Sequence, residues 1–359
     1  MYTEKKTRDP KQFVVQLVQT PSPSGYEEKV QEVVRQYVSP FAEKVTTDVH
    51  GNVIASRNGD SPFRIMLSGH CDQIGLLVNY IVGDGFVSTV QLGGWDPQTL
   101  VGQRVTIWGK KGPVSGVIGR KAIHLLNEDE RKKVLRVQDL WVDIGAASKE
   151  EAQSVVDVGD CCTVDLVYRE MLANRFTAVA TDDKTGVWVV MEALRRIDPA
   201  KLSVGVFAVS TVQEEVGLRG ARTSAFGIDP AVGIAVDVTH ATDSPSIDKK
   251  LSGEIRLGAG AVISVGPNMN RKLTSELLAI GQKEQIATQV LAEGRITGTD
   301  AAMLQVNRAG VAAGLVSIPN RYMHTPVEVV SWDDMNAAAD LLARYCESVT
   351  PQSSYIPGL

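Results

Sequence analysis

The feature that most constrains this chain is a long block of strand-type sequence inside an alternation of helix-type and strand-type segments. Helical periodicity and short apolar runs alternate up to about residue 74 and return after about residue 175. Between about Ile74 and Val167, short β-type runs recur between Gly and Asp turns, with little helical periodicity. Evenly spaced short strands are typical of a small barrel or sandwich. The pattern predicts an α/β fold interrupted by an inserted all-β domain.

Composition and charge exclude several classes of protein. The 359 residues are 43% hydrophobic and 22% charged, as in a globular protein of two domains or of one domain with an insertion. The net charge of -5, without a long basic run, predicts no nucleic-acid partner. No apolar stretch approaches the roughly 20 residues that span a bilayer, and no apolar segment of a secretory signal follows residues 1–13. Four cysteines are too few for a disulfide framework, so a cytoplasmic protein without a membrane partner is expected.

The first candidate site residue is His70, in the motif SGHCD directly after the apolar run Arg64–Ser68. Open α/β sheets place functional groups at the carboxyl ends of their strands. Asp72 is close enough to accept a hydrogen bond from one ring nitrogen of His70, which would leave the other nitrogen free to bind a metal ion. Taken alone, the motif leaves a surface histidine as the alternative.

The second candidate is the pair Glu214 and Glu215, in TVQEEVGLRG directly after the strand predicted at residues 203–210. Adjacent like charges at a strand end repel each other unless a cation or a shared proton relieves them. Successive side chains point in different directions, so one carboxylate can bind a metal ion while the other faces a water molecule. The alternative is a solvated acidic pair at the start of a helix.

Three further positions follow the same pattern, each with a structural alternative. Asp182 and Asp183 precede a predicted helix, where N-capping is the alternative role. Asp237 lies in the apolar run VGIAVDV, and a buried carboxylate there needs a partner or a metal ion. His324 follows the strand predicted at residues 311–318, and a lone histidine in that place is more often structural.

Together these residues indicate a metal centre. Two histidines and at least three carboxylates, each just past a strand, would converge at one edge of a single sheet. Histidine with Asp and Glu suits zinc or cobalt, whereas magnesium and calcium prefer shells made of oxygen alone. There are enough carboxylates for two metal ions roughly 3.5–4 Å apart that share a bridging Asp and a bridging water.

The motifs SGHCDQIG, TDDKTG, TVQEEVGLRGA, AVDVTHA, GTDA and RYMHTPVE resemble those of the dinuclear aminopeptidases of metallopeptidase family forty-two. That family includes tetrahedral TET aminopeptidases and glutamyl aminopeptidases, and some members carry an endoglucanase label. The resemblance implies a three-layer α/β exopeptidase-type catalytic domain at residues 1–74 and 169–359. It also implies a barrel-like dimerisation domain at residues 75–168, and dimers that assemble into a tetrahedral dodecamer.

The resemblance further implies a role for each candidate residue. It implies two divalent metal ions per subunit, with zinc expected and cobalt or manganese as alternatives, held by five residues: His70, Asp182, Glu215, Asp237 and His324. His70 and Asp237 would bind separate ions, and Asp182 would bridge both. Glu214 would be the general base, and Asp72 would orient His70. One departure is that Lys184 stands where the family usually has an arginine after the Asp pair.

The implied reaction is hydrolysis of N-terminal residues from small peptides. The closest alternative is a carboxypeptidase or deacetylase of the same wider clan, which only a substrate assay separates. A glycosidase that uses Glu214 and Glu215 is less favoured, because its two carboxyl groups must flank the bond roughly 5–9.5 Å apart. That reading also leaves His70 and His324 unexplained.

Overall fold

The larger part of the molecule is built on one eight-stranded sheet. In this computed structural model, which describes residues 9–358, the strands are β1 (Lys44–Thr47), β2 (Val53–Arg57), β3 (Arg64–His70), β12 (Gly205–Thr211), β13 (Val232–His240), β14 (Ala261–Val265), β15 (Thr288–Ala292) and β16 (Ala312–Asn320). Their order in the sheet is β1-β2-β12-β3-β13-β16-β14-β15. The four central strands β12, β3, β13 and β16 are parallel, so their carboxyl ends meet at one edge. The absence of a secretory signal is predicted in part from residues 1–8, and these residues lie outside the described range.

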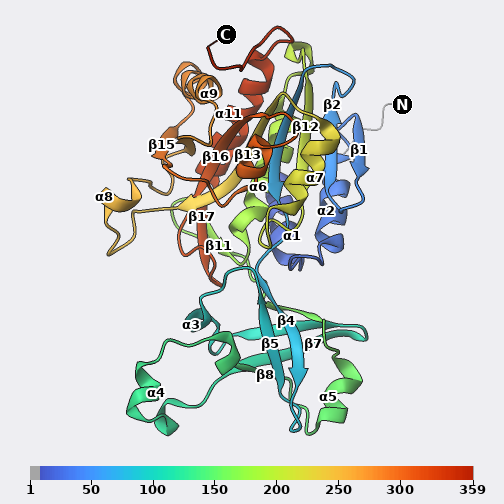
Figure 1. Cartoon of the computed structure of the whole chain (residues 1–359), viewed down its shortest axis with the longest axis vertical. Coiled ribbons are helices and arrows are strands. Elements are labelled where there is room, and N and C mark those ends of the chain that lie inside the picture. Colours follow the sequence, from blue (N-terminus) through green and yellow to red (C-terminus); the bar gives the residue numbers. More distant parts are fainter. Residues whose placement is uncertain (1–8, 359) are drawn as a thin grey trace.

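Helices cover both faces of this sheet. One face carries α1 (Pro10–Gln19), α2 (Glu28–Val38), α6 (Thr181–Arg196), α9 (Arg271–Lys283) and α11 (Trp332–Ser348), and the other carries α7 (Arg219–Ile228) and α10 (Asp300–Gln305). Alternate residues of β3 serve the two layers, since Leu67 packs in the core of the first face and Met66 in that of the second. The predicted α/β fold is therefore confirmed as three layers, α on β on α (Figure 1).

The inserted strands close into a barrel below the sheet in Figure 1. They are β4 (Gly75–Ile81), β5 (Val87–Leu92), β6 (Arg104–Gly109), β7 (Gly112–Gly119), β8 (Trp141–Asp143) and β9 (Cys161–Val164), paired antiparallel in the order β4-β5-β8-β7-β6-β9. Side chains such as Val78, Ile107 and Val142 form a core that is separate from the cores of the sheet. Of the barrel and sandwich that the sequence allowed, the structure has the barrel.

Several short elements were not predicted. Within the insertion they are α3 (Pro97–Leu100), α4 (Glu128–Lys132), α5 (Lys149–Val155), η1 (Ile123–Leu125) and η2 (Val137–Asp139), and elsewhere η3 (Pro199–Lys201) and α8 (Lys249–Ser252). A small antiparallel sheet joins β10 (Arg169–Met171), β11 (Arg175–Ala178) and β17 (Glu328–Ser331). This sheet matters for the site because β11 leads into α6 and β17 begins at the buried Glu328.

The cysteines and the lengths of the helices complete the description of the fold. Cys71, Cys161, Cys162 and Cys346 are buried and form no disulfide bond. Over residues 9–358, every helix is too short or too polar to cross a membrane.

Candidate metal centre

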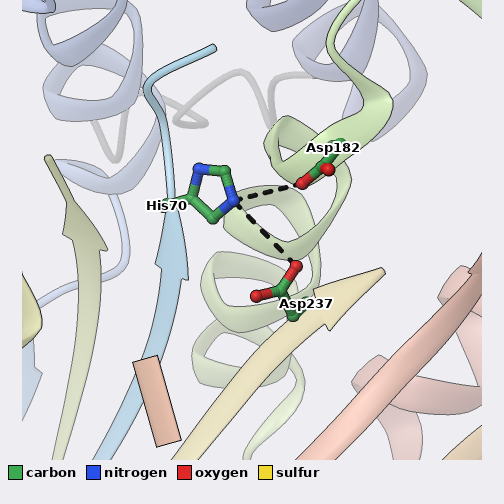
Figure 2. A group of neighbouring side chains, drawn as sticks. All are labelled: His70, Asp182 and Asp237. Carbon is green, nitrogen blue, oxygen red and sulfur yellow. Dashed lines mark hydrogen bonds and ion pairs between the residues drawn. The ribbon is translucent and has the colours of Figure 1, made fainter. Parts of the chain in front are cut away.

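The carboxyl ends of two neighbouring strands bring the first group of site residues together. His70 is the last residue of β3, and β13 pairs with β3 so that Ala235 lies opposite Ser68. Two residues further along each strand, His70 and Asp237 therefore lie next to each other. In Figure 2, Asp182 from the first turn of α6 completes the group. Nε2 of His70 is 3.1 Å from Oδ1 of Asp182 and 4.0 Å from Oδ1 of Asp237.

A second group shares Asp182 with the first. Nε2 of His324 is 3.2 Å from Oδ2 of Asp182 and 3.4 Å from Oε1 of Glu215. In each group the possible ligand atoms lie within 4.8 Å of one another, which is close enough to hold one metal ion. All five expected ligand residues are therefore brought together, and the carboxylate of Asp182 belongs to both groups.

One expectation about these residues is corrected. The resemblance implied that His70 and Asp237 would bind separate ions, but they belong to the same group. The reason is the strand order: β3 and β13 are neighbours in the sheet, so residues at corresponding positions cannot be far apart. Glu215 and His324 come instead from the segments that follow β12 and β16, and together they form the second group.

Backbone carbonyl groups orient both histidine rings. Nδ1 of His70 lies 3.1 Å from the carbonyl oxygen of Asp72, and Nδ1 of His324 lies 2.7 Å from that of Gly94. Since a carbonyl oxygen only accepts, each Nδ1 carries a hydrogen, and each Nε2 is the ring atom that faces the carboxylates and would bind a metal ion. Asp72 does contact His70, as expected, but its backbone oxygen is nearer than its carboxylate, which is 3.4 Å from Nδ1.

The Asp72 carboxylate is also the anchor of the glutamate pair. Its Oδ1 accepts the backbone N–H of Glu214 at 3.0 Å, and its Oδ2 accepts that of Glu215 at 3.2 Å. Oδ2 also accepts the hydroxyl of Ser24 at 2.6 Å. One buried carboxylate therefore fixes the backbone of Glu214 and Glu215 and also lies beside the ring of His70.

Sequence reasoning missed Glu328, although it is the last residue of the motif RYMHTPVE. Glu328 is 2% exposed and accepts the backbone N–H groups of Asp182 at 3.1 Å and of His324 at 3.0 Å. It thereby joins the bridging aspartate to the histidine of the second group. Asp183 has a similar supporting role, because it accepts the backbone N–H of His70 at 3.1 Å.

Lys184, the departure noted in the sequence, is fully buried behind the site. Its ammonium group donates to the carbonyl of Thr20 and to Oε1 of Gln73, both at 2.7 Å. Burial lowers the pKa of Lys184 to about 7. The side chain supports the segment at residues 20–25 and lies in neither ligand group, so the departure leaves the ligand residues intact.

The two histidines experience strong negative potential. Hydrogen bonds with Asp182 and Glu215 raise the pKa of His324 to about 11. Burial opposes protonation of His70, but the charge of Glu214 and a hydrogen bond with Asp182 outweigh it, so the pKa of His70 lies well above its usual value. Without another cation each ring is therefore in its charged imidazolium form, and a divalent ion would replace the proton on Nε2.

The carboxylates show the complementary effect. Burial raises the pKa of Glu214 to about 10 against the opposing charge of His70, and Asp237 adds to the rise. Burial likewise raises the pKa of Asp237 well above its ordinary range. Asp182 differs, because hydrogen bonds with His324 and His70 outweigh its burial and lower its pKa. Crowded carboxylates beside two imidazoles are the donor set that zinc-type ions take, so these residues fit a pair of divalent cations.

Glu214 stands apart from the ligand groups while remaining at the site. Its Oε2 is 3.8 Å from Nε2 of His70, yet Glu214 belongs to neither group of possible ligands. A cavity of about 350 Å³ opens onto Glu214 and the two groups. The rest of its lining comes from the end of β13, from Glu293, from residues 296–299 and from part of β16.

Comparisons with known proteins match nearly the whole chain. The profile of the M42 glutamyl aminopeptidase family matches residues 51–341. A lysyl aminopeptidase of Pyrococcus furiosus is 37% identical over 344 residues, which cover 95% of this chain and 97% of that protein.

Solved structures give the same result. The TET aminopeptidase of a marine sediment Thaumarchaeota archaeon has a TM-score of 0.90 at 33% identity, covering 95% of this chain and 97% of the other. The TET1 peptidase of Pyrococcus horikoshii has a TM-score of 0.85 at 31% identity, covering 95% of this chain and all of the other.

Proposed function

The chain belongs to the M42 glutamyl aminopeptidase family, and from this membership we infer that it is a metal-dependent aminopeptidase, a hydrolase of peptide bonds. We propose that it releases N-terminal residues from short peptides at the two ligand groups. The observation that carries the proposal is the single carboxylate of Asp182, which lies 3.1 Å from His70 and 3.2 Å from His324 and so faces both groups.

The proposed centre holds two divalent ions. His70 and Asp237 would bind one ion, His324 and Glu215 would bind the other, and Asp182 would bridge them. Zinc is the metal we propose, with cobalt and manganese as alternatives, because imidazole with carboxylate suits these ions. When bound, such ions would polarise the scissile carbonyl and lower the pKa of a nucleophilic water toward neutrality.

Glu214 is the proposed general base. It is buried, it faces the cavity, and its backbone is fixed by Asp72, so its carboxylate can meet a water molecule at the ligand groups. It would take a proton from that water and deliver it to the leaving amine. Positive charge placed in the centre would counter the burial and the neighbouring charges that raise the pKa of Glu214, which favours the ionised form of the base.

The geometry disfavours the glycosidase alternative. Glu215 is engaged with His324 in a possible metal group, so it is not free to act as a second glycosidic carboxyl partner of Glu214. A carboxypeptidase or deacetylase would share the same ligand groups, and the comparisons favour the aminopeptidase over both.

We propose that the chain is a cytoplasmic homo-oligomer. The Pyrococcus horikoshii relative is described as assembling into a tetrahedron or a large octahedral shell. The barrel has its own core, so residues 75–168 are the segment we propose for dimerisation, with further assembly into a dodecamer. Enclosure of the sites would restrict access to small peptides and to unfolded chain ends.

The decisive experiment uses a panel of aminoacyl-p-nitroanilides and short peptides. We expect N-terminal residues to be released, activity to disappear on exhaustive chelation, and activity to return with zinc, cobalt or manganese. Release from the carboxyl end would favour the carboxypeptidase, and activity that survives full chelation would overturn the metal-dependent proposal.

A further inference from the structure

The part of the cavity lining that lies outside the ligand groups carries an unused negative charge. The cavity is lined by Glu293, which lies in neither ligand group and is not the proposed base. Among residues 9–358, no side-chain hydrogen bond or ion pair is made by its carboxylate. The carboxylates of the ligand groups would be balanced by bound ions, whereas the charge of Glu293 would remain unbalanced inside the cavity.

The backbone holds Glu293 firmly in this place. It directly follows β15, and its N–H donates to the carbonyl of Val265 at 2.8 Å. A Cβ added to Gly266 would lie 1.9 Å from the carbonyl oxygen of Glu293, so only glycine permits this close approach. The carboxylate therefore extends from a fixed point, which favours a role in recognition.

The rest of the wall suits a long aliphatic side chain. Ile296 and Leu315 supply apolar surface, and Thr297 and Thr299 supply hydroxyl groups that lie 3.0 Å apart. No lysine or arginine is present in the lining that the structure describes. Apart from His240, an acidic side chain would therefore find no basic partner in this part of the lining, whereas a lysine could pack its stem on apolar surface and place its ammonium group near a carboxylate.

We propose that Glu293 determines specificity, so that the enzyme prefers peptides whose N-terminal residue is lysine or arginine and disfavours N-terminal glutamate. The inference rests on the proposed aminopeptidase function and names the substrate class of the same cavity. The family is described as glutamyl aminopeptidases and one relative is a lysyl aminopeptidase, so these names do not decide the substrate preference of this chain. The inference rests instead on the charges in the cavity lining.

The test compares lysyl- and norleucyl-p-nitroanilide, because lysine and norleucine share a straight aliphatic stem and lysine alone carries an ammonium group. We expect kcat/KM of the parent enzyme to favour the lysyl substrate on the order of tenfold, as for a hydrogen bond to a charged group. Glu293→Gln should bring this ratio close to one, and Glu293→Lys should favour glutamyl-p-nitroanilide. Arg295→Gln is the matched control, because Arg295 is exposed and lies outside the cavity lining.

The outcomes separate this inference from the proposed function. An unchanged ratio of the two kcat/KM values in Glu293→Gln would overturn the inference. If both values also fell by the same factor, Glu293 would be assigned to the substrate α-amine instead. A parent enzyme that hydrolyses no aminoacyl substrate with any of the three metals would contradict the proposed function. Calorimetric titration with free L-lysine and L-norleucine tests the contact without turnover: tighter binding of lysine by the parent, lost in Glu293→Gln, is expected, and equal binding would overturn the inference.

Discussion

His324 donates its Nδ1 hydrogen to the carbonyl oxygen of Gly94 at 2.7 Å, although the two residues belong to different parts of the fold. Gly94 lies between β5 and α3 on the barrel side, whereas His324 follows the last long strand of the sheet. A Cβ on Gly93 would lie 3.0 Å from the Glu215 carboxylate, so this segment closely approaches the second ligand group. The inserted part therefore contributes to the candidate metal centre as well as being a candidate for assembly.

This relationship predicts that loosening the Gly94 segment will weaken metal binding. Trp95 holds the segment, because its indole N–H donates to the carbonyl of Gly75 at 3.0 Å. Trp95→Phe removes that donor and should lower the affinity of the second ion about tenfold, the lower end of the effect of removing a partner that orients a metal ligand. Competition with a chelating dye measures the loss. Trp108→Phe is the control, since its indole N–H donates to Thr163 elsewhere in the barrel, and equal losses in both variants would contradict the prediction.

Glu214→Gln should remove most turnover and leave the metal content close to that of the parent. The substitution keeps the shape of the side chain and removes the base, which typically costs 10²–10⁴-fold, roughly, in rate. Glu215→Gln is the matched comparison and should lose metal, because its carboxylate is 3.4 Å from His324 in the second group. Emptied sites in Glu214→Gln would transfer the role of base to Glu215.

Asp182→Asn should harm both metal sites, whereas His324→Ala should harm one. Asp182 faces both groups, and its loss removes negative charge that would balance two cations. We expect elemental analysis to find about two ions per chain in the parent, about one in His324→Ala, and fewer in Asp182→Asn. The same metal occupancy in Asp182→Asn and in the parent would show that this carboxylate does not bridge.

Gly69→Ala should destabilise the fold close to the site. A Cβ on Gly69 would lie 2.5 Å from the backbone carbon of Gly186, where β3 crosses α6. Overpacking of this kind costs about 1–3 kcal/mol in the free energy of unfolding, which urea titration measures. Gly227→Ala is the control, because its Cβ would meet no atom within 4 Å in α7, and it should be neutral or stabilising by up to about 1 kcal/mol. Equal stability of Gly69→Ala and the parent would refute the steric argument.

The elements that carry long periodic signals were the predictable part of the fold. The apolar run at β13 and the stripe of Val30, Val34 and Val38 on α2 are local patterns, and both appear where the sequence places them. The small sheet of β10, β11 and β17 could not be found in this way. Its strands are three or four residues long, and β17 pairs with β11 from a distant part of the chain.

The same division holds for the site. Each expected ligand residue was visible because its charged side chain lies near or just past the end of an apolar strand, or at the start of a helix. The grouping of His70 with Asp237 was not visible, because it depends on β3 and β13 being neighbours, which no local pattern records. The contact of Gly94 with His324 had no signal at all, since a backbone carbonyl is the same in every residue.

The final prediction concerns the mass of the assembled protein. The barrel has a core of its own, and the segment between β7 and β8 exposes Ile123, Leu125 and Val134, which are 63%, 69% and 72% exposed. Apolar surface of this kind on a separate β-domain favours association, and closed point-group symmetry makes partly assembled forms rare. Light scattering of metal-loaded protein should therefore give a mass of roughly twelve chains of 38.7 kDa each. If assembly stops at the dimer, the mass should be that of two chains. The measurement is repeated over a dilution series, because a closed assembly keeps its mass while a non-specific aggregate does not. A monodisperse monomer with full peptidase activity would contradict both dimerisation through the barrel and enclosure of the sites.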